Sequence, residues 1–353
     1  MKKHVAFHLD PLDDSRDMTF LRLNYYFHLA QSLTAAGWTC SFIGLEKYKS
    51  RALESGSFDS VIGLPTIIYP WDWYGQYHLL AQNHALPDTL TAAIDDAYAS
   101  IAIDGEIIIT NTPSTLLRRK FPQALILHYE YGMFSRTPFP RMHQLDPWGY
   151  SHKSLLSKYP ALGLKPSQAH RDRLLEIRQQ AITSAGLDPQ MIGQENSIHM
   201  PLQSEKNWPI RLETQLQRKD MIDQLMRIHP NKDIVITEKS GHGLAPEVRA
   251  ALLTKRRIRL MQEDAGLSTG SFQTAYCHAT YTTSPSLSLQ TIAWGNQLIA
   301  PPNSSMALWQ MNDRTLAHET LASYIGNFSI YEPADLTRVI SNGWTLHATH
   351  GAI

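Results

Sequence analysis

Short apolar runs alternate with amphipathic segments along most of the chain, and this order constrains the fold more than any other feature. The runs at residues 106–110 (EIIIT), 124–129 (ALILHY) and 233–237 (DIVIT) are typical of buried strands. Between the opening run and its successor, residues 19–36 carry apolar side chains at helical spacing, and Gly37 stops the helix. A strand–loop–helix–strand order predicts a parallel sheet.

The same alternation restarts after residue 190, so the chain is expected to form two Rossmann-like α/β domains, residues 1–190 and 191–353, facing each other across a cleft. The predicted strands are residues 4–9, 38–45, 106–110, 124–129, 197–203, 233–237, 258–262, 279–283 and 297–300. The predicted helices are residues 19–36, 87–100, 112–120, 169–185, 212–228, 246–253, 270–278, 288–294 and 333–341.

Composition and missing motifs exclude several classes of protein. The 32 Lys and Arg balance the 32 Asp and Glu, which gives no global attraction to nucleic acid. There is no P-loop, no GxGxxG, no Asp-x-Asp and no HExxH, so no metal and no other cofactor is expected. The two cysteines form no disulfide framework, and no apolar run reaches a membrane span. A cytoplasmic protein is expected, with peripheral contact at the inner membrane surface as a further possibility.

Ligands of such sheets lie beyond the carboxyl ends of the strands, so the residues there are the candidate site. Glu130 follows one strand and can act as an acid or base at a hydroxyl. Gln203 and Glu205 follow another. After the 233–237 strand, Lys239, Ser240 and His242 lie among glycines and can meet a phosphate.

Two serines, Ser284 and Ser286, precede a helix, where free N–H groups and hydroxyls form an anion site; simple capping of that helix is the alternative. His229 begins a His-Pro pair that precedes a strand. It is a candidate for binding the nucleotide donor, although the pair is most simply a helix stop. An aromatic cluster at Trp71, Trp73 and Tyr74 is more typical of a core than of a sugar-stacking surface.

Taken together, three short motifs resemble the bacterial capsule and O-antigen Kdo transferases and, more loosely, the GT-B sialyltransferases. They are Glu130-Tyr131-Gly132, Pro201-Leu202-Gln203, and the serine turn before a helix that ends at Gly295. One motif departs from the family pattern. Where the family has a His-Pro pair after a strand, this chain has the 238–242 segment, and its own pair at His229 lies one element earlier.

The resemblance implies a metal-independent GT-B glycosyltransferase that moves Kdo or a related 2-keto sugar acid from a CMP donor to a bacterial surface glycan or glycolipid. It implies that Glu130 is the acid/base group and that Ser284 and Ser286 hold the CMP phosphate. Glu205 is the candidate for a second carboxylate in a retaining, double-displacement reaction, whereas Glu130 alone suffices for inversion. Two alternatives stay open: a GT-B enzyme with a UDP, GDP or TDP sugar, and a non-catalytic two-lobed sugar- or nucleotide-binding protein.

Overall fold

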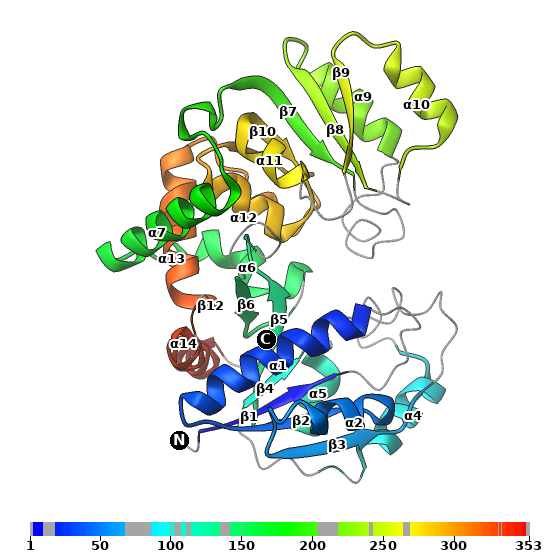
Figure 1. The fold of residues 1–353 in the computed structure, drawn as a ribbon, viewed down its shortest axis with the longest axis vertical. Coiled ribbons are helices and arrows are strands. Elements are labelled where there is room, and N and C mark those ends of the chain that lie inside the picture. Colours follow the sequence, from blue (N-terminus) through cyan, green and yellow to red (C-terminus); the bar gives the residue numbers. More distant parts are fainter. Residues whose placement is uncertain are drawn as a thin grey trace. The chain divides into compact units, whose positions relative to one another are not determined.

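The chain forms two compact units, and it passes between them several times (Figure 1). The first unit consists of residues 1–130, 144–155 and 330–353, and the second of residues 131–143 and 156–329. The structure, a computed structural model, describes residues 3–9, 18–67, 86–99, 101, 107–110, 114–134, 142–149, 151–202, 218–239, 243–263, 269–330, 332 and 334–350.

The first unit is built on a sheet with the order β12-β6-β5-β4-β1-β2-β3 in the described part of the chain. The strands are β1 (His4–His8), β2 (Thr39–Leu45), β3 (Ser60–Leu64), β4 (Ile107–Thr110), β5 (Leu125–Tyr131), β6 (His143–Asp146) and β12 (Ser329–Ile330). The helices are α1 (Met18–Ala35), α2 (Lys49–Glu54), α4 (Asp88–Tyr98), α5 (Ser114–Lys120) and α14 (Asp335–His350), with 3-10 turns η1 (Glu46–Tyr48) and η2 (Ser151–Lys153). β3, β2, β1, β4 and β5 pair in parallel.

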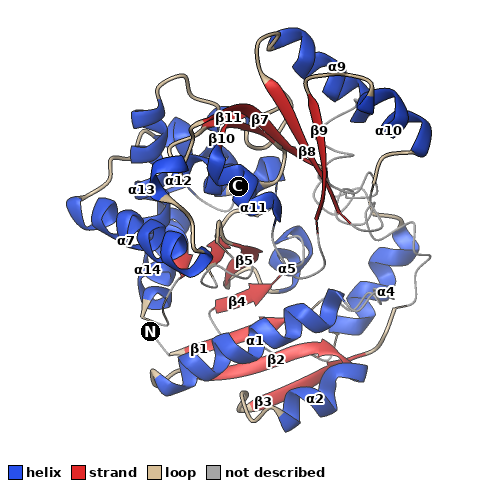
Figure 2. Ribbon diagram, turned by 45° about the horizontal axis from the view of Figure 1, so that its top comes forward, coloured by secondary structure: helices blue, strands red, loops and turns tan. Residues whose placement is uncertain are grey.

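Alternation along these strands divides the core between two faces of the sheet, and Figure 2 shows α1 running alongside β1 and β2. Val5, Phe7 and Leu127 pack with α1 and α14 on one face. Ala6 and Ile126 pack with α4 and α5 on the other. The strands are therefore apolar on both sides, as parallel strands covered by helices must be.

The second unit contains a fully parallel sheet with the order β11-β10-β7-β8-β9. Its strands are β7 (Glu195–Pro201), β8 (Asp233–Lys239), β9 (Ile258–Glu263), β10 (Cys277–Tyr281) and β11 (Gln297–Ile299). Its helices are α7 (Gln168–Ala185), α9 (Arg218–Ile228), α10 (Pro246–Leu253), α11 (Thr269–Tyr276), α12 (Pro285–Ala293) and α13 (Arg314–Phe328). The chain enters it through α6 (Leu155–Lys158), and 3-10 turns are η3 (Tyr159–Leu162), η4 (Pro189–Met191) and η5 (Ala307–Trp309).

Different helices cover the two faces of this sheet as well. Ile198 and Met200 of β7 belong to an apolar cluster with Ile222 of α9 and Leu252 of α10. His199, which points to the opposite face, bonds to Thr274 of α11. Both units thus have the strand order 3-2-1-4-5 of a Rossmann fold, which confirms the predicted α/β class with two Rossmann-like halves.

The division of the chain differs from the predicted boundary between residues 190 and 191. Residues 156–190 belong to the second unit, where Arg171 of α7 donates from Nε to both carboxylate oxygens of Glu319 on α13 at 2.9 Å. Residues 330–353 return to the first unit, because Leu336, Val339 and Ile340 of α14 complete its core. The periodicity of the sequence shows where elements lie but carries no sign of such a return.

Two helix predictions were wrong in detail. The final helix, expected at residues 333–341, runs to His350, and α13 was missed altogether. α13 is buried over most of its length, and the buried positions mix small side chains with large apolar ones, so it lacks a clear amphipathic pattern. Residues 277 and 278, expected to end a helix, open β10 instead.

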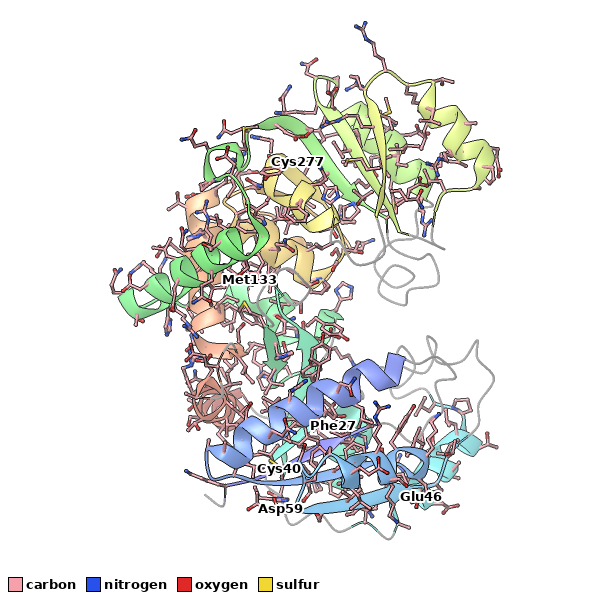
Figure 3. The ribbon with its side chains drawn as sticks, viewed as in Figure 1. Phe27, Cys40, Glu46, Asp59, Met133 and Cys277 are labelled. Atoms are coloured by element: carbon pink, nitrogen blue, oxygen red, sulfur yellow. The ribbon has the colours of Figure 1, made fainter. Side chains whose placement is uncertain are left out.

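Both cysteines are buried and free, one in each unit (Figure 3). Burial raises the pKa of Cys40 and of Cys277 to about 11, so neither is a thiolate near neutral pH. The Cys40 amide donates to Asp59 Oδ2 at 2.8 Å, which ties the start of β2 to the start of β3. Among the described residues no helix is long and apolar enough to cross a membrane.

Candidate functional site

The topological switch point of the second sheet lies between β7 and β10. From β7 the chain adds β8 and β9 on one side and then β10 and β11 on the other. In open α/β sheets, ligands bind at the carboxyl edge where the strand order reverses in this way. The residues that follow these two strands are Leu202 on one side and Thr282, Thr283 and Ser284 on the other.

The start of α12 presents unused hydrogen-bond donors at this switch point. Ser284 is the N-cap residue, yet its hydroxyl makes no capping bond and lies 3.2 Å from Ser286 Oγ. The amides of Ser286 and Leu287 have no acceptor within the described part of the chain. Two free N–H groups, two hydroxyls and the positive end of the helix dipole form a site for an anion.

Further hydroxyls are buried close to this turn in the sequence. Thr282 Oγ1 accepts from the Ser284 amide at 3.0 Å and so fixes the turn that enters α12. Thr280 Oγ1 and Ser288 Oγ are fully buried and have no hydrogen-bond partner among the described residues. Buried hydroxyls of this kind are rare in proteins and are often satisfied by water or ligand.

His199 lies within β7 and fixes three elements of the second unit. Its Nδ1 lies 3.0 Å from Thr274 Oγ1 of α11 and its Nε2 lies 2.9 Å from Thr237 Oγ1 of β8. Complete burial lowers the pKa of His199 to about 3, so the ring is neutral. The polar network holds α11 against the sheet beside the switch point.

The segment after β8 is anchored where it rejoins the described chain. Glu238 is fully buried; its Oε1 accepts from the Leu244 amide at 2.8 Å, and its Oε2 forms an ion pair with Arg249 at 2.9 Å. Arg218 Nη1 donates to the Gly243 carbonyl at 3.1 Å. These contacts fix Gly243 and Leu244, which follow the predicted phosphate-binding residues in the sequence. Lys239 is the last residue of β8, whereas Ser240 and His242 lie outside the described residues.

Glu130 does not follow the strand as predicted: it is the sixth residue of β5, which ends at Tyr131, two residues beyond the predicted end at residue 129. It is half-buried and shares its face of the sheet with Ile126, opposite Tyr129. The glycine that follows has a structural reason to be small, because a Cβ on Gly132 would lie 2.8 Å from Met142 Cβ. Its amide also donates to the Met142 carbonyl at 3.0 Å.

The remaining predicted residues fall in two groups. Gln203, Glu205, Trp71, Trp73 and Tyr74 lie outside the described residues. His229 follows the last residue of α9, so its His-Pro pair stands where a helix stops, as predicted. It precedes β8 and therefore lies at the amino edge of the sheet, where the structure does not bring it together with Ser284 and Ser286.

A buried polar group that was not predicted from the sequence lies at the switch point of the first sheet, between β1 and β4. His8 Nδ1 lies 2.8 Å from Thr110 Oγ1, and its Nε2 lies 2.7 Å from Tyr98 OH. Burial lowers the pKa of His8 to about 3. The signal was available, since His8 and Thr110 are the last residues of two neighbouring strands.

Among the described residues no three His, Cys, Asp or Glu side chains converge as metal ligands do. No family model matches the chain, and no curated protein matches it.

Solved structures with a similar course of the chain include several glycosyltransferases. A β-Kdo 2,7 transferase, KpsC from Thermosulfurimonas dismutans, is 13% identical and covers 82% of this chain and 92% of its own, with a TM-score of 0.47. A glycosyltransferase from Rickettsia africae is 12% identical and covers 99% of both chains, with a TM-score of 0.41. Arabidopsis thaliana UGT89C1 complexed with UDP is 10% identical and covers 99% of this chain and 100% of its own, with a TM-score of 0.43.

Proposed function

We propose that this chain is a glycosyltransferase that takes a sugar from a nucleotide donor, and that the amino end of α12 holds the donor phosphate. The observation that carries the proposal is that the amides of Ser286 and Leu287, at the β7–β10 switch point, find no acceptor among the described residues. Together with the hydroxyls of Ser284 and Ser286, they offer a negatively charged leaving group several hydrogen bonds. The helix dipole stabilises the charge that develops on the leaving phosphate.

The finer assignment is a CMP donor carrying Kdo or a related 2-keto sugar acid, with a bacterial surface glycan or glycolipid as acceptor. It is supported by the resemblance of the serine turn and of Glu130-Tyr131-Gly132 to the Kdo transferases. In this assignment Glu130 is the acid/base group, and Glu205 is the second carboxylate if the reaction retains configuration. Gln203, Lys239, Ser240 and His242 contact the nucleotide. His229 lies at the amino edge of the sheet, so this assignment gives it no role in donor binding.

The experiment is thermal unfolding with CMP, CDP, UDP, GDP and TDP at millimolar concentration. A ligand present at 100 times its Kd stabilises the folded state by about 2.7 kcal/mol, which gives a clear rise in Tm. Stabilisation by CMP alone is expected. Stabilisation by a nucleoside diphosphate instead would replace the CMP donor while keeping the transferase. No response to any nucleotide would contradict the phosphate site at α12.

Ser286→Asp is the sharpest variant, because its effects on folding and on binding have opposite signs. A carboxylate in the first turn of a helix stabilises it by about 0.3–1 kcal/mol. The same charge repels a phosphate, so the Tm without ligand should hold or rise while the CMP-induced shift disappears. Ser167→Asp places an equal charge at the N-cap of α7 in the same unit and should leave the CMP shift intact.

A further inference from the structure

Three basic side chains lie at the amino edge of the second sheet, on or beside neighbouring strands and away from the proposed donor site. His278 is the second residue of β10, Lys232 precedes β8, and Arg314 is the first residue of α13. Arg314 Nη2 lies 2.9 Å from His278 Nε2. The Lys232 ammonium donates to Asn196 Oδ1 at 2.6 Å. Ser284 follows the carboxyl end of β10, whereas His278 lies near its amino end. Because a strand rises about 3.3 Å per residue, β10 keeps the two residues apart.

No carboxylate of the described residues forms an ion pair with Lys232 or Arg314. Three carboxylates lie near them in the sequence or the sheet. Glu195 pairs with Arg259 at 2.8 Å, Asp313 caps α13, and Asp233 opens β8 next to Lys232. Burial lowers the pKa of His278, and the positive charges of Lys232 and Arg314 lower it further. The pKa of His229 is likewise lowered, first by burial and then by Lys232.

The geometry leaves donors available for a ligand. Arg314 Nη2 lies 2.9 Å from His278 Nε2 and 3.5 Å from its Nδ1, so the neutral ring accepts through the nearer Nε2 and carries its proton on Nδ1. The guanidinium has five N–H groups in a fixed fork and the ammonium has three, so the contacts above use only part of them. Basic side chains that form no ion pair are stabilised by an anion with several acceptor oxygens.

We propose that Lys232, His278 and Arg314 bind a phosphoryl anion, either free phosphate or the phosphate monoester of a lipid headgroup. A tetrahedral group with two charges can accept from all three side chains at once, whereas a single carboxylate offers fewer oxygens and half the charge. The site is separate from the amino end of α12, because the two lie at opposite edges of one parallel sheet.

The test is a titration of the full chain with inorganic phosphate, followed by the imidazole NMR signal of His278. The signal is assigned with His278→Gln. Phosphate should bind saturably and raise the pKa of His278 by one unit or more, which corresponds to a tenfold preference for the protonated ring. Lys232→Gln and Arg314→Gln should each weaken phosphate binding at least tenfold.

Lys219→Gln is the matched control, because it removes one positive charge from the same unit at a lysine paired with Asp223. It should leave phosphate binding unchanged. An equal loss in Lys219→Gln would show attraction by total charge and would overturn the site. The absence of a saturable change at His278 in the wild type would also overturn it, provided that vesicles give no binding either.

Sedimentation with vesicles separates the two sources of the phosphoryl group. Binding to phosphatidylcholine vesicles that contain phosphatidic acid, lost in Arg314→Gln and kept in Lys219→Gln, would assign the site to a lipid headgroup. Saturable binding of inorganic phosphate without retention on these vesicles would assign it to a free phosphate. The outcome does not depend on the CMP-induced rise in Tm, so the two proposals can fail separately.

Discussion

The strands at the two switch points have the same order, but the polar groups that they place near the carboxyl edge differ. Each first strand carries a buried, neutral histidine that bonds to the helix before the fourth strand: His8 to Tyr98 of α4, and His199 to Thr274 of α11. His8 is the last residue of β1. His199 is followed by two more strand residues, ending at Pro201.

This offset of two residues decides what each carboxyl edge can bind. In the first sheet the histidine joins the strand ends themselves, since its partner Thr110 is the last residue of β4. In the second sheet the polar network lies deeper, and the start of α12 keeps its amides free. Within the described residues, similar side chains on similar folds therefore close one switch point and leave the other open.

Glu130→Gln gives the largest expected effect and tests which strand end of the first sheet takes part in chemistry. With the β1–β4 position closed, the candidate is the carboxylate at the end of β5. Loss of a general acid or base slows turnover by about 10²–10⁴-fold. Release of nucleotide from the sugar donor should fall by this factor, while the CMP-induced rise in Tm stays unchanged.

The control is Glu54→Gln, which alters an exposed carboxylate at the end of α2 in the same unit. It should leave both turnover and binding unchanged. Full turnover in Glu130→Gln would remove Glu130 from the reaction, whereas nucleotide binding without turnover in the wild type would favour a binding protein.

His8→Phe asks whether the first switch point is structural. The substitution removes two buried hydrogen bonds of about 1 kcal/mol each and leaves hydroxyls poorly satisfied, so the free energy of unfolding should fall by about 2–4 kcal/mol. Urea unfolding measures this loss. Tyr98→Phe removes one of the two bonds and should cost about 1 kcal/mol. A stable His8→Phe protein that had lost turnover would break the comparison, because it would make the first switch point a ligand site.

The fold could be predicted from the sequence because parallel strands buried on both faces leave continuous apolar runs. The runs at β4, β5 and β8 are such cases. The return of α14 to the first unit could not, since apolar spacing predicts a helix but does not specify the sheet against which Leu336, Val339 and Ile340 pack. α13 was missed because it is buried on most sides and mixes small residues with large apolar ones.

The candidate site was predictable only in part. The serine turn stood out because hydroxyls before a helix mark its amino end. Whether those hydroxyls cap the helix or face a ligand depends on rotamers that the sequence does not specify. His8 was overlooked because a lone histidine in an apolar strand has no pattern, and its partners are about 90 and 102 positions away.

Both switch points contain a buried, neutral histidine, and the pH dependence of stability tests this shared feature. The ordinary pKa of histidine is 6.5, and that of His8 and of His199 is about 3 in the folded protein. Between these values the unfolded chain binds protons that the folded chain does not, so stability falls as the pH falls. Each histidine contributes about 1.4 kcal/mol per pH unit over this range. In urea unfolding between pH 6 and pH 4, His199→Phe should show a slope shallower by this amount. An unchanged slope would mean that His199 is protonated in the folded state.

Ser284→Ala gives the smallest expected effect on stability and the finest test of the open switch point. A capping hydroxyl or carboxylate contributes about 1 kcal/mol, but the Ser284 hydroxyl makes no capping bond. Its removal should therefore lower the free energy of unfolding by only about 0.3 kcal/mol or less, a few tenths of what a working cap supplies.

Asp313→Ala is the matched contrast in the same unit, because Asp313 Oδ1 accepts from the amides of Thr315 and Leu316 at the start of α13. That variant should lose about 1 kcal/mol and keep its full response to CMP, whereas Ser284→Ala should keep its stability and bind CMP several-fold more weakly. If Ser284→Ala instead lost as much stability as Asp313→Ala, the serine would be an ordinary cap and the two switch points would both be closed.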